Sequence, residues 1–250
     1  MILSEIVQAK SAEIQMMKAS RRSLRKAISS SKGLAVIAEI KKASPSRGII
    51  EKTLSSEDRL RRYIEGGAAA VSVVTEKNFF GGSIETLKNL STLSSVPLLR
   101  KDFIIDPIQL YESLLSGADA VLLIARLLEG DLLPMMVEKS MELGLEVLVE
   151  VHTPEELKRA MDTSAGIIGI NNRNLEDFSI DFKVTQKMMN LLHKLETPLR
   201  RKVVSESGIA SVEDAVFLAS CGVDAVLVGT YLVGTENPQE KIQEIIERTR

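Results

Sequence analysis

Eight short apolar segments alternate with helix signals along most of the chain, and this order limits the folds that the chain can adopt. The segments are rich in Val, Ile and Leu, as expected for strands that are buried on both faces of a sheet. They lie at approximately 34–41, 69–75, 97–102, 119–125, 145–151, 166–171, 202–207 and 224–229. Strands that alternate with helices predict a parallel sheet, and 250 residues is the usual length of a closed barrel. We therefore predict an α/β protein with a single (β/α)8 TIM barrel.

Polar residues mark where the helices between these segments begin. Ser56, Asp106, Thr153 and Ser211 each precede acidic residues or proline, which is the pattern of a helix N-terminus. Glycines before the following strands suit the left-handed position at which helices commonly end. These signals support one strand and one helix in each repeating unit.

Residues 1–33 differ from the repeating part of the chain. Apolar residues recur there at helical spacing, at Leu3, Ile6, Val7, Ile14 and Met17. The basic stretch SRRSLRKA follows them, so we expect one or two helices before the barrel. No linker or low-complexity segment interrupts the chain, which predicts one domain over residues 1–250 with residues 1–33 as an N-terminal helical extension.

The composition argues against several classes of protein. Apolar content of 44% and charged content of 26% are typical of soluble globular proteins. The 32 basic and 34 acidic residues give a net charge of −2, so we expect no nucleic acid partner. Cys221 is the only cysteine, which excludes an intrachain disulfide and a multi-cysteine metal site. Without a signal-peptide pattern or an apolar run near ~20 residues, we expect no membrane contact and a cytoplasmic location.

Charged and polar residues collect at the C-terminal ends of six of the predicted strands. They are Glu39 and Lys41, Lys101, Glu150, Asn171 and Arg173, Glu206 and Ser207, and Gly229 and Thr230. Lysine and glutamate are costly to bury, so their recurrence at one end of the strands needs a functional reason. In a (β/α)8 barrel these ends converge on the face that carries the active site. The sequence therefore predicts an enzyme whose catalytic groups come from different strands.

Four of these side chains favour acid–base chemistry. Glu39 and Lys41 are two residues apart on one strand, so they point the same way. Taken alone, this pair is equally well explained as a salt bridge that closes the barrel. Lys101 and Glu150 at two further strand ends make mutual neutralisation a poor explanation, and general acid–base catalysis on a small molecule fits better.

Several loops after the strands suit a phosphorylated aromatic ligand. Ser207-Gly208 and Gly229-Thr230 follow the seventh and eighth strands, where these barrels often bind phosphate, although tight turns would need the same glycines. Ser44 follows the first strand, in a loop that is either a plain turn or a segment that closes on an anion. Phe80 and Phe103 also lie in such loops, where they either bind an aromatic ring or pack against the core.

Two histidines are present, and neither has partners at metal-ligand spacing. We expect His152 to stabilise a loop and His193 to lie at the surface, and we expect no metal ion or other cofactor.

Seven segments together resemble the indole-3-glycerol phosphate synthase family. They are IAEIKKASPSRG at 37–48, TEKNFFG at 75–81, LRKDF at 99–103, LVEVH at 148–152, IGINNRNL at 168–175, VSESG at 204–208 and VGT at 228–230. They span the chain in the order of the family. Two departures are Asn172, where Ser or Thr is more usual, and Ser205, where Ala is more usual.

The resemblance implies a ring closure without a cofactor. The family converts 1-(2-carboxyphenylamino)-1-deoxyribulose 5-phosphate into indole-3-glycerol phosphate, CO2 and water. Lys101 would donate a proton to the ketone oxygen, and Lys41 and Glu150 would assist the later loss of hydroxide. Glu39 would orient and tune the lysines. The expected partner is this phosphorylated small molecule alone, and a monomer is the working expectation.

The resemblance also assigns the binding residues. Asn171 and Arg173 would hold the substrate in a reactive conformation, and Glu206 would bind the ribulose hydroxyls. Ser44 and Lys41 would lie near its phosphate and carboxylate ends. The phosphate residues would be Ser207, Gly208, Gly229 and Thr230. The aromatic pocket would be lined by Phe80 and Phe103.

Two other functions stay open at this point. Another phosphosugar enzyme on the same fold, such as phosphoribosylanthranilate isomerase, would need an Asp/Cys acid–base pair, whereas Cys221 lies on a predicted helix. A non-catalytic protein that binds a phosphorylated metabolite would not need Lys41, Lys101 and Glu150 together.

Overall fold

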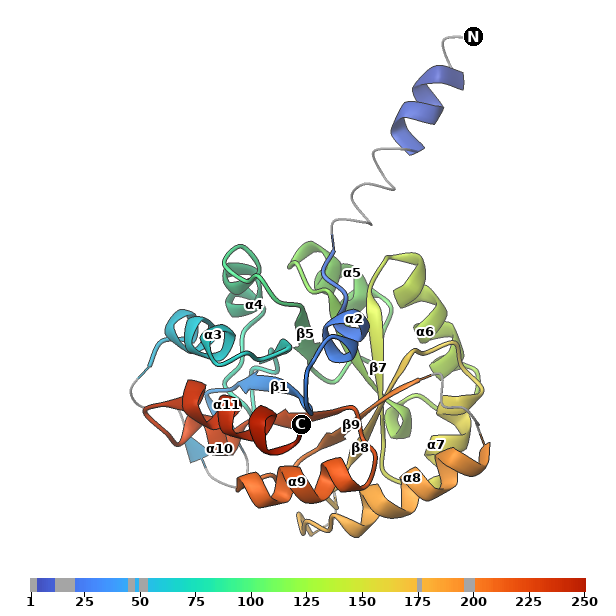
Figure 1. The fold of residues 1–250 in the computed structure, drawn as a ribbon. Helices are drawn as coiled ribbons and strands as arrows, with labels where there is room; N and C mark the ends of the chain where they lie inside the picture. Colours follow the sequence, from blue (N-terminus) through green and yellow to red (C-terminus); the bar gives the residue numbers. More distant parts are fainter. Residues whose placement is uncertain (1–3, 12–20, 45–47, 50–53, 175–176, 196–200) are drawn as a thin grey trace.

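The parallel strands close into a barrel in the computed structural model, which confirms the predicted (β/α)8 fold (Figure 1). The model describes residues 4–11, 21–44, 48–49, 54–174, 177–195 and 201–250, with only the backbone of residues 44, 48 and 49. The barrel strands are β1 (Ala35–Ile40), β4 (Ala70–Val74), β5 (Leu98–Lys101), β6 (Ala120–Ile124), β7 (Glu146–Val151), β8 (Ile167–Asn171), β9 (Lys202–Glu206) and β10 (Ala225–Val228). Each lies within its predicted segment, and β1 closes the barrel by pairing in parallel with both β4 and β10.

Helices cover the outside of the barrel between successive strands (Figure 1). They are α3 (Ser56–Glu65), α4 (Ile84–Ser91), α5 (Ile108–Leu115), α6 (Leu132–Glu142), α7 (Pro154–Met161), α8 (Lys183–Leu195), α9 (Val212–Ser220) and α11 (Pro238–Arg248). Shorter elements are α2 (Leu24–Ser29), the 3-10 turn η1 (Ala125–Leu127), α10 (Thr230–Val233), and the antiparallel pair β2 (Ala43–Ser44) and β3 (Gly48–Ile49). Of the predicted N-terminal extension, residues 4–11 are helical and exposed, whereas Leu3, Ile14 and Met17 lie outside the described residues.

The helix starts follow the sequence signals with two shifts. Pro107, not the predicted Asp106, is the N-cap residue of α5, although Asp106 Oδ1 accepts the Ile108 backbone N–H at 2.8 Å. The side chains of Thr153 and Ser211 cap α7 and α9, and Ser211 forms a capping box with Asp214. Ser55, not the predicted Ser56, caps α3, because its hydroxyl is the one that accepts from the Asp58 backbone N–H. Ser55 and Ser56 are adjacent and both fit the N-cap pattern, so the sequence alone could not show which of them caps α3.

Two apolar layers support the barrel. Residues that alternate along the strands, such as Ile37, Leu99 and Leu148, fill the interior of the barrel. Their neighbours on the other face of each strand pack under the surrounding helices. This alternation decides which strand residues point towards the barrel axis, and therefore which can reach a site at its end.

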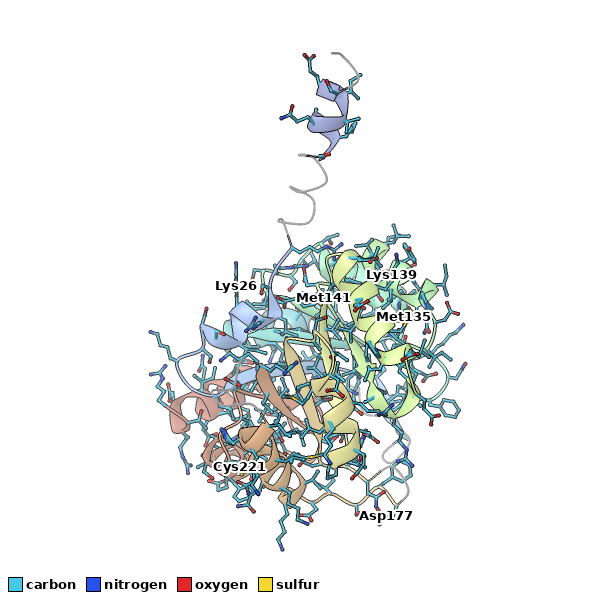
Figure 2. The ribbon with its side chains drawn as sticks, turned by 90° about the vertical axis from the view of Figure 1, so that its right-hand side faces the viewer. Lys26, Met135, Lys139, Met141, Asp177 and Cys221 are labelled. Carbon is cyan, nitrogen blue, oxygen red and sulfur yellow. The ribbon has the colours of Figure 1, made fainter. Side chains whose placement is uncertain are left out.

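Helix α2 closes the N-terminal end of the barrel. Leu24 and Ile28 pack against the interior layer. Ahead of the helix, Arg22 pairs with Asp119 at 2.9 Å, and the Ser23 hydroxyl donates to Glu146 at 2.6 Å. In Figure 2, Lys26 of α2 and Asp177 of the loop after β8 lie on opposite sides of the barrel. The C-terminal ends of the strands are thus the open end. Across the described residues, every helix is too short or too polar to cross a bilayer.

Candidate active site

A cavity of about 720 Å³ lies at the C-terminal ends of the strands. Every predicted site residue whose side chain is described lines it. They are Glu39, Lys41, Phe80, Lys101, Phe103, Glu150, Asn171, Arg173, Glu206, Ser207, Gly208, Gly229 and Thr230. The side chain of Ser44, the remaining predicted residue, lies outside the described part of the chain. Cys221 follows α9 and does not line this cavity (Figure 2).

Three of the charged residues each pair with the last residue of a neighbouring strand, at the C-terminal end of the barrel. Lys101 pairs with Val74, Glu150 with Ile124, and Glu206 with Asn171. Each charged residue follows, two positions later, a residue of the barrel interior, so its side chain also points inwards. These charged groups therefore form a polar layer on top of the apolar interior of the barrel.

Glu39 and Lys41 form a close ion pair inside the cavity. Lys41 Nζ lies 2.7 Å from Glu39 Oε1, and both side chains are largely buried. Burial by itself would raise the pKa of Glu39, but the cations of Lys41, Lys101 and Arg173 outweigh burial and lower it. Glu39 is therefore a carboxylate that holds Lys41, and the salt bridge is part of the site.

Lys101 is surrounded by carboxylates. Its Nζ lies 3.8 Å from Glu150 Oε2, and 26% of its side chain is exposed towards the cavity. Burial by itself would lower the pKa of Lys101, but Glu150, Glu206 and Glu39 outweigh it and raise the pKa above its ordinary value. Lys101 thus carries its proton at neutral pH.

The chain that follows Lys101 is held by the buried guanidinium of Arg100. Arg100 Nη2 donates to Asp102 at 3.0 Å and to Glu112 of α5 at 2.7 Å. Its Nε donates to Thr75 at the end of β4 at 3.1 Å. Because these bonds tie β4, β5 and α5 together, the backbone that carries Lys101 has little freedom.

Glu150 is held through one of its two oxygens. Oε1 accepts from Asn171 Nδ2 at 3.0 Å and lies 3.3 Å from His152 Nε2. Oε2 has no hydrogen-bond donor among the described residues and faces Lys101. The free oxygen is therefore the one that is directed at the lysine and the cavity.

Glu206 is the most strongly perturbed acid of the site. It is buried, and neither oxygen has a hydrogen-bond donor within the described residues. Burial raises its pKa well above the ordinary value, and the carboxylates of Glu150 and Glu39 raise it further against the opposing effect of Lys101. Gly169 makes room for this carboxyl, because a Cβ there would lie 2.1 Å from Glu206 Oε1.

This raised pKa predicts that Glu206 limits the stability of the protein. In the folded state the carboxyl favours its neutral form, so its favourable contribution is complete at low pH and is lost as the pH rises through the folded-state pKa. Glutamine is neutral at every pH. Glu206→Gln should raise the melting temperature by at least about 2 °C at about pH 9, with a smaller gain at about pH 5. The exposed Glu138→Gln on α6 is the control, and an equal gain at both pH values would contradict the assignment.

Backbone turns shape the end of the cavity beside β9 and β10. Ser207 and Gly208 are left-handed, with φ of 67° and 94°. Gly229 precedes α10, and a Cβ on it would lie 2.3 Å from Glu39 Oε1 and 2.9 Å from Lys41 Nζ. Residue 229 must therefore lack a side chain, because the Glu39–Lys41 ion pair occupies the space that a Cβ would take.

Apolar and aromatic side chains form the opposite wall. The rings of Phe80 and Phe103 lie 6.2 Å apart at an interplanar angle of 40°. Glu76 fixes the loop of Phe80 by accepting its backbone N–H at 3.0 Å. Leu122 and Ile124 of β6 complete this wall, and Phe103 is 46% exposed. The wall suits a flat apolar ring.

The cavity also contains residues that the sequence did not single out. They include Arg126 of η1, Phe178 and Ile180 after β8, and Tyr231 of α10. Arg173 donates to the Phe178 carbonyl at 3.3 Å and bridges to Ile180. The sequence signal for Phe178 is the same as for Phe80 and Phe103, an aromatic residue in a loop after a barrel strand.

The two departures from the family pattern contact each other. Asn172 Nδ2 donates to Ser205 Oγ at 2.9 Å and to the Glu206 carbonyl at 2.9 Å. Thr185 of α8 donates to Asn172 Oδ1 at 2.7 Å. These buried bonds tie the ends of β8 and β9 together behind the cavity, so Asn172 supports the site without lining it.

Among the described residues, no group of three His, Cys, Asp or Glu side chains is arranged to bind a metal ion.

Comparisons with known proteins agree with this geometry. Among solved structures, a thiamine phosphate pyrophosphorylase from Pyrococcus furiosus has a TM-score of 0.63 at 16% identity, covering 91% of this chain and 98% of that chain, which shows a shared fold alone. An indole-3-glycerol phosphate synthase from Petrotoga mobilis is 43% identical over 250 residues, which cover 100% of this chain and 98% of the relative. Another, from Desulforamulus reducens, is 47% identical over 225 residues, covering 90% of this chain and 83% of the relative. The model of the indole-3-glycerol phosphate synthase family matches residues 3–245, and the chain therefore belongs to that family.

Proposed function

We propose that the protein is a carboxy-lyase of tryptophan biosynthesis that closes an indole ring. It converts 1-(2-carboxyphenylamino)-1-deoxyribulose 5-phosphate into indole-3-glycerol phosphate, CO2 and water. The observation that carries the proposal is the protonated Lys101, held among the carboxyl groups of Glu39, Glu150 and Glu206 at the centre of a cavity with an apolar wall and a glycine-rich end.

Ring closure needs a proton at the ketone. An aromatic carbon of the substrate attacks the ketone carbon, and Lys101 donates its proton to the oxygen as the C–C bond forms. Charge on that oxygen develops only in the transition state, so the lysine contributes mainly to kcat. Loss of CO2 then restores the aromatic ring.

The final dehydration needs an acid and a base. Lys41 donates a proton to the departing hydroxyl, which leaves as water, and Glu150 accepts a proton from the ring system. Glu39 holds Lys41 in the cavity through their 2.7 Å ion pair. The free Oε2 of Glu150 suits a base, because no donor among the described residues occupies it.

The remaining residues bind and orient the substrate. Asn171 and Arg173 restrict it to a reactive conformation, an entropic contribution that reaches several kcal/mol in general. Glu206 binds a ribulose hydroxyl through a hydrogen bond. Phe80 and Phe103 contact the carboxyphenyl ring.

The phosphate lies at the end formed by Gly208 and Gly229. Ser207 and Thr230 add hydroxyl donors, and Ser44 lies on the chain two residues beyond the Lys41–Lys42 pair, near the phosphate and carboxylate ends. Loops after the last two strands are the usual phosphate site in barrels of this kind.

The direct test is an assay with this substrate. Purified protein should form a product with indole fluorescence, and one CO2 should be released for each product molecule. Ligand binding without product would instead identify a binding protein.

Cys221 lies outside the cavity lining, which disfavours the Asp/Cys chemistry of phosphoribosylanthranilate isomerase.

Substitution of Gly229 should weaken phosphate binding. In Gly229→Ala the new methyl group meets Glu39 and Lys41 and obstructs the backbone donors, so KM should rise by about tenfold or more. Inorganic phosphate at tens of millimolar should compete with substrate in the parent protein and much less in the variant. Gly166→Ala is the matched control, since its methyl group would lie 3.5 Å from the nearest atom, in Arg25. Absence of phosphate competition in the parent would refute this site.

A further inference from the structure

His152 lies between two carboxylates directly after β7. Its Nε2 is 3.3 Å from Glu150 Oε1, and its Nδ1 is 3.3 Å from Glu156 Oε2. Only 8% of the side chain is exposed. A loop-stabilising role would explain the contact with Glu156 alone, but it does not explain why the other ring nitrogen faces the base of the active site.

Glu156 fixes the orientation of the imidazole. It lies in the first turn of α7, where its Oε2 also accepts the backbone N–H of His152 at 2.7 Å. Burial by itself would raise the pKa of Glu156, but the bonds from the His152 ring and backbone and the nearby Arg126 outweigh it and lower the pKa. Glu156 is therefore a carboxylate, and His152 Nδ1 must donate its hydrogen to it.

With Nδ1 donating to Glu156, the contact between His152 Nε2 and Glu150 Oε1 is favourable only if it contains a further proton. When the ring is neutral with its hydrogen on Nδ1, Nε2 carries a lone pair that faces Glu150 Oε1. Nε2 has no aligned hydrogen-bond partner among the described residues, although Oε1 is within ion-pair distance. Two acceptors at this separation attract only when one proton lies between them. The other groups facing the Glu150 carboxylate are Asn171 on the same oxygen, and Lys101 and Glu206.

We propose that His152 is a positioning residue that shares a proton with Glu150 Oε1 and is held for this purpose by Glu156. The shared proton fixes Oε1 against His152 and Asn171, so Oε2 stays directed at Lys101 and the reacting molecule. It also links the basicity of Glu150 to a carboxylate on α7, outside the cavity lining. The inference rests on the proposed role of Glu150 as a base.

A first experiment tests the shared proton without turnover. Ring resonances of the two histidines are followed by NMR as a function of pH, and His152→Gln and His193→Gln assign them. Glu150→Gln removes the negative charge beside Nε2, so the midpoint of the His152 resonance should move to lower pH by about 0.5 unit or more. The midpoint of the exposed His193 should not move. An unchanged His152 midpoint would overturn the proposal, whether or not the protein has the proposed activity.

A second experiment tests the effect on catalysis. His152→Gln should lower kcat by about tenfold or more with less than about a threefold change in KM, because orientation of the base matters most in the transition state. Glu156→Gln should move the alkaline limb of the kcat profile to lower pH, since the charge that retains the shared proton is lost. His193→Gln is the control for kinetics. A pH profile that is unchanged in both variants, with only a lower melting temperature, would assign His152 a structural role and overturn the inference. Failure of the parent to form product would instead refute the proposed function.

Discussion

Lys101→Ala is expected to lower kcat by about 10³-fold, equivalent to about 4 kcal/mol of transition-state stabilisation. The lysine is protonated because Glu150, Glu206 and Glu39 raise its pKa above the ordinary value. Alanine removes the proposed proton donor but leaves the aromatic wall and the proposed phosphate site intact. KM should therefore change by less than about threefold, which steady-state kinetics and titration of product binding will measure.

Two comparisons make this result specific. Lys88→Ala removes an exposed lysine from α4 and should leave kcat unchanged. Circular dichroism must show that Lys101→Ala is folded, because three neighbouring carboxyl groups lose a cation. A decrease in kcat of less than about tenfold, or about 1.4 kcal/mol, would exclude Lys101 as the proton donor.

The barrel could be predicted from sequence because each strand carries its own signal. Strands buried on both faces, such as β6 and β10, consist of little except Val, Leu, Ile and Ala. The convergence of Lys101, Glu150 and Glu206 could be predicted as well, since the C-terminal ends of parallel strands meet at one face. Strand alternation then places these residues in one cavity, while their catalytic roles stay predictions.

What the sequence could not provide is the environment of each group. Glu39, Glu150 and Glu206 look alike as residues at strand ends, yet the pKa of Glu39 is lowered and that of Glu206 is raised. Both carboxyl groups are buried, but Lys41 and other cations outweigh burial at Glu39, whereas burial and the charges of Glu150 and Glu39 prevail at Glu206. These effects depend on distances between strands that are remote in sequence, and no local pattern encodes them.

The loop residues that line the cavity were also difficult to predict from sequence. Phe178 and Ile180 reach the cavity because the chain after β8 folds back, with a bridge between Arg173 and Ile180 and a φ of 60° at Phe178. A left-handed phenylalanine has no sequence signature, since glycine or asparagine is the usual residue there. The contact between Asn172 and Ser205 could not be predicted either, although both residues depart from the family pattern.

Glu150→Gln is expected to lower kcat by about 10²-fold to 10⁴-fold, the range over which general acid–base groups contribute. Glutamine preserves the shape of the side chain, and its carbonyl oxygen can still accept from Asn171. It cannot take a proton from the ring system, so the step that stops is the loss of water. A ring-closed species that has released CO2 but kept its hydroxyl should accumulate, and rapid quench with mass spectrometry will detect it.

The competing explanation for Glu150 is that it only neutralises Lys101, from which its Oε2 lies 3.8 Å away. In that case glutamine would leave single-turnover product formation near normal and would change mainly the pH dependence of the melting temperature. Glu155→Gln on the exposed side of α7 supplies the control for removal of one negative charge nearby.

A base and a counter-ion also differ in the step of the reaction at which they are needed. The base is needed after decarboxylation, so CO2 should still be released in the first turnover of Glu150→Gln while indole fluorescence is delayed. Release of CO2 and fluorescence at the same slow rate would place the defect at ring closure and contradict the role of Glu150 as the base of the dehydration.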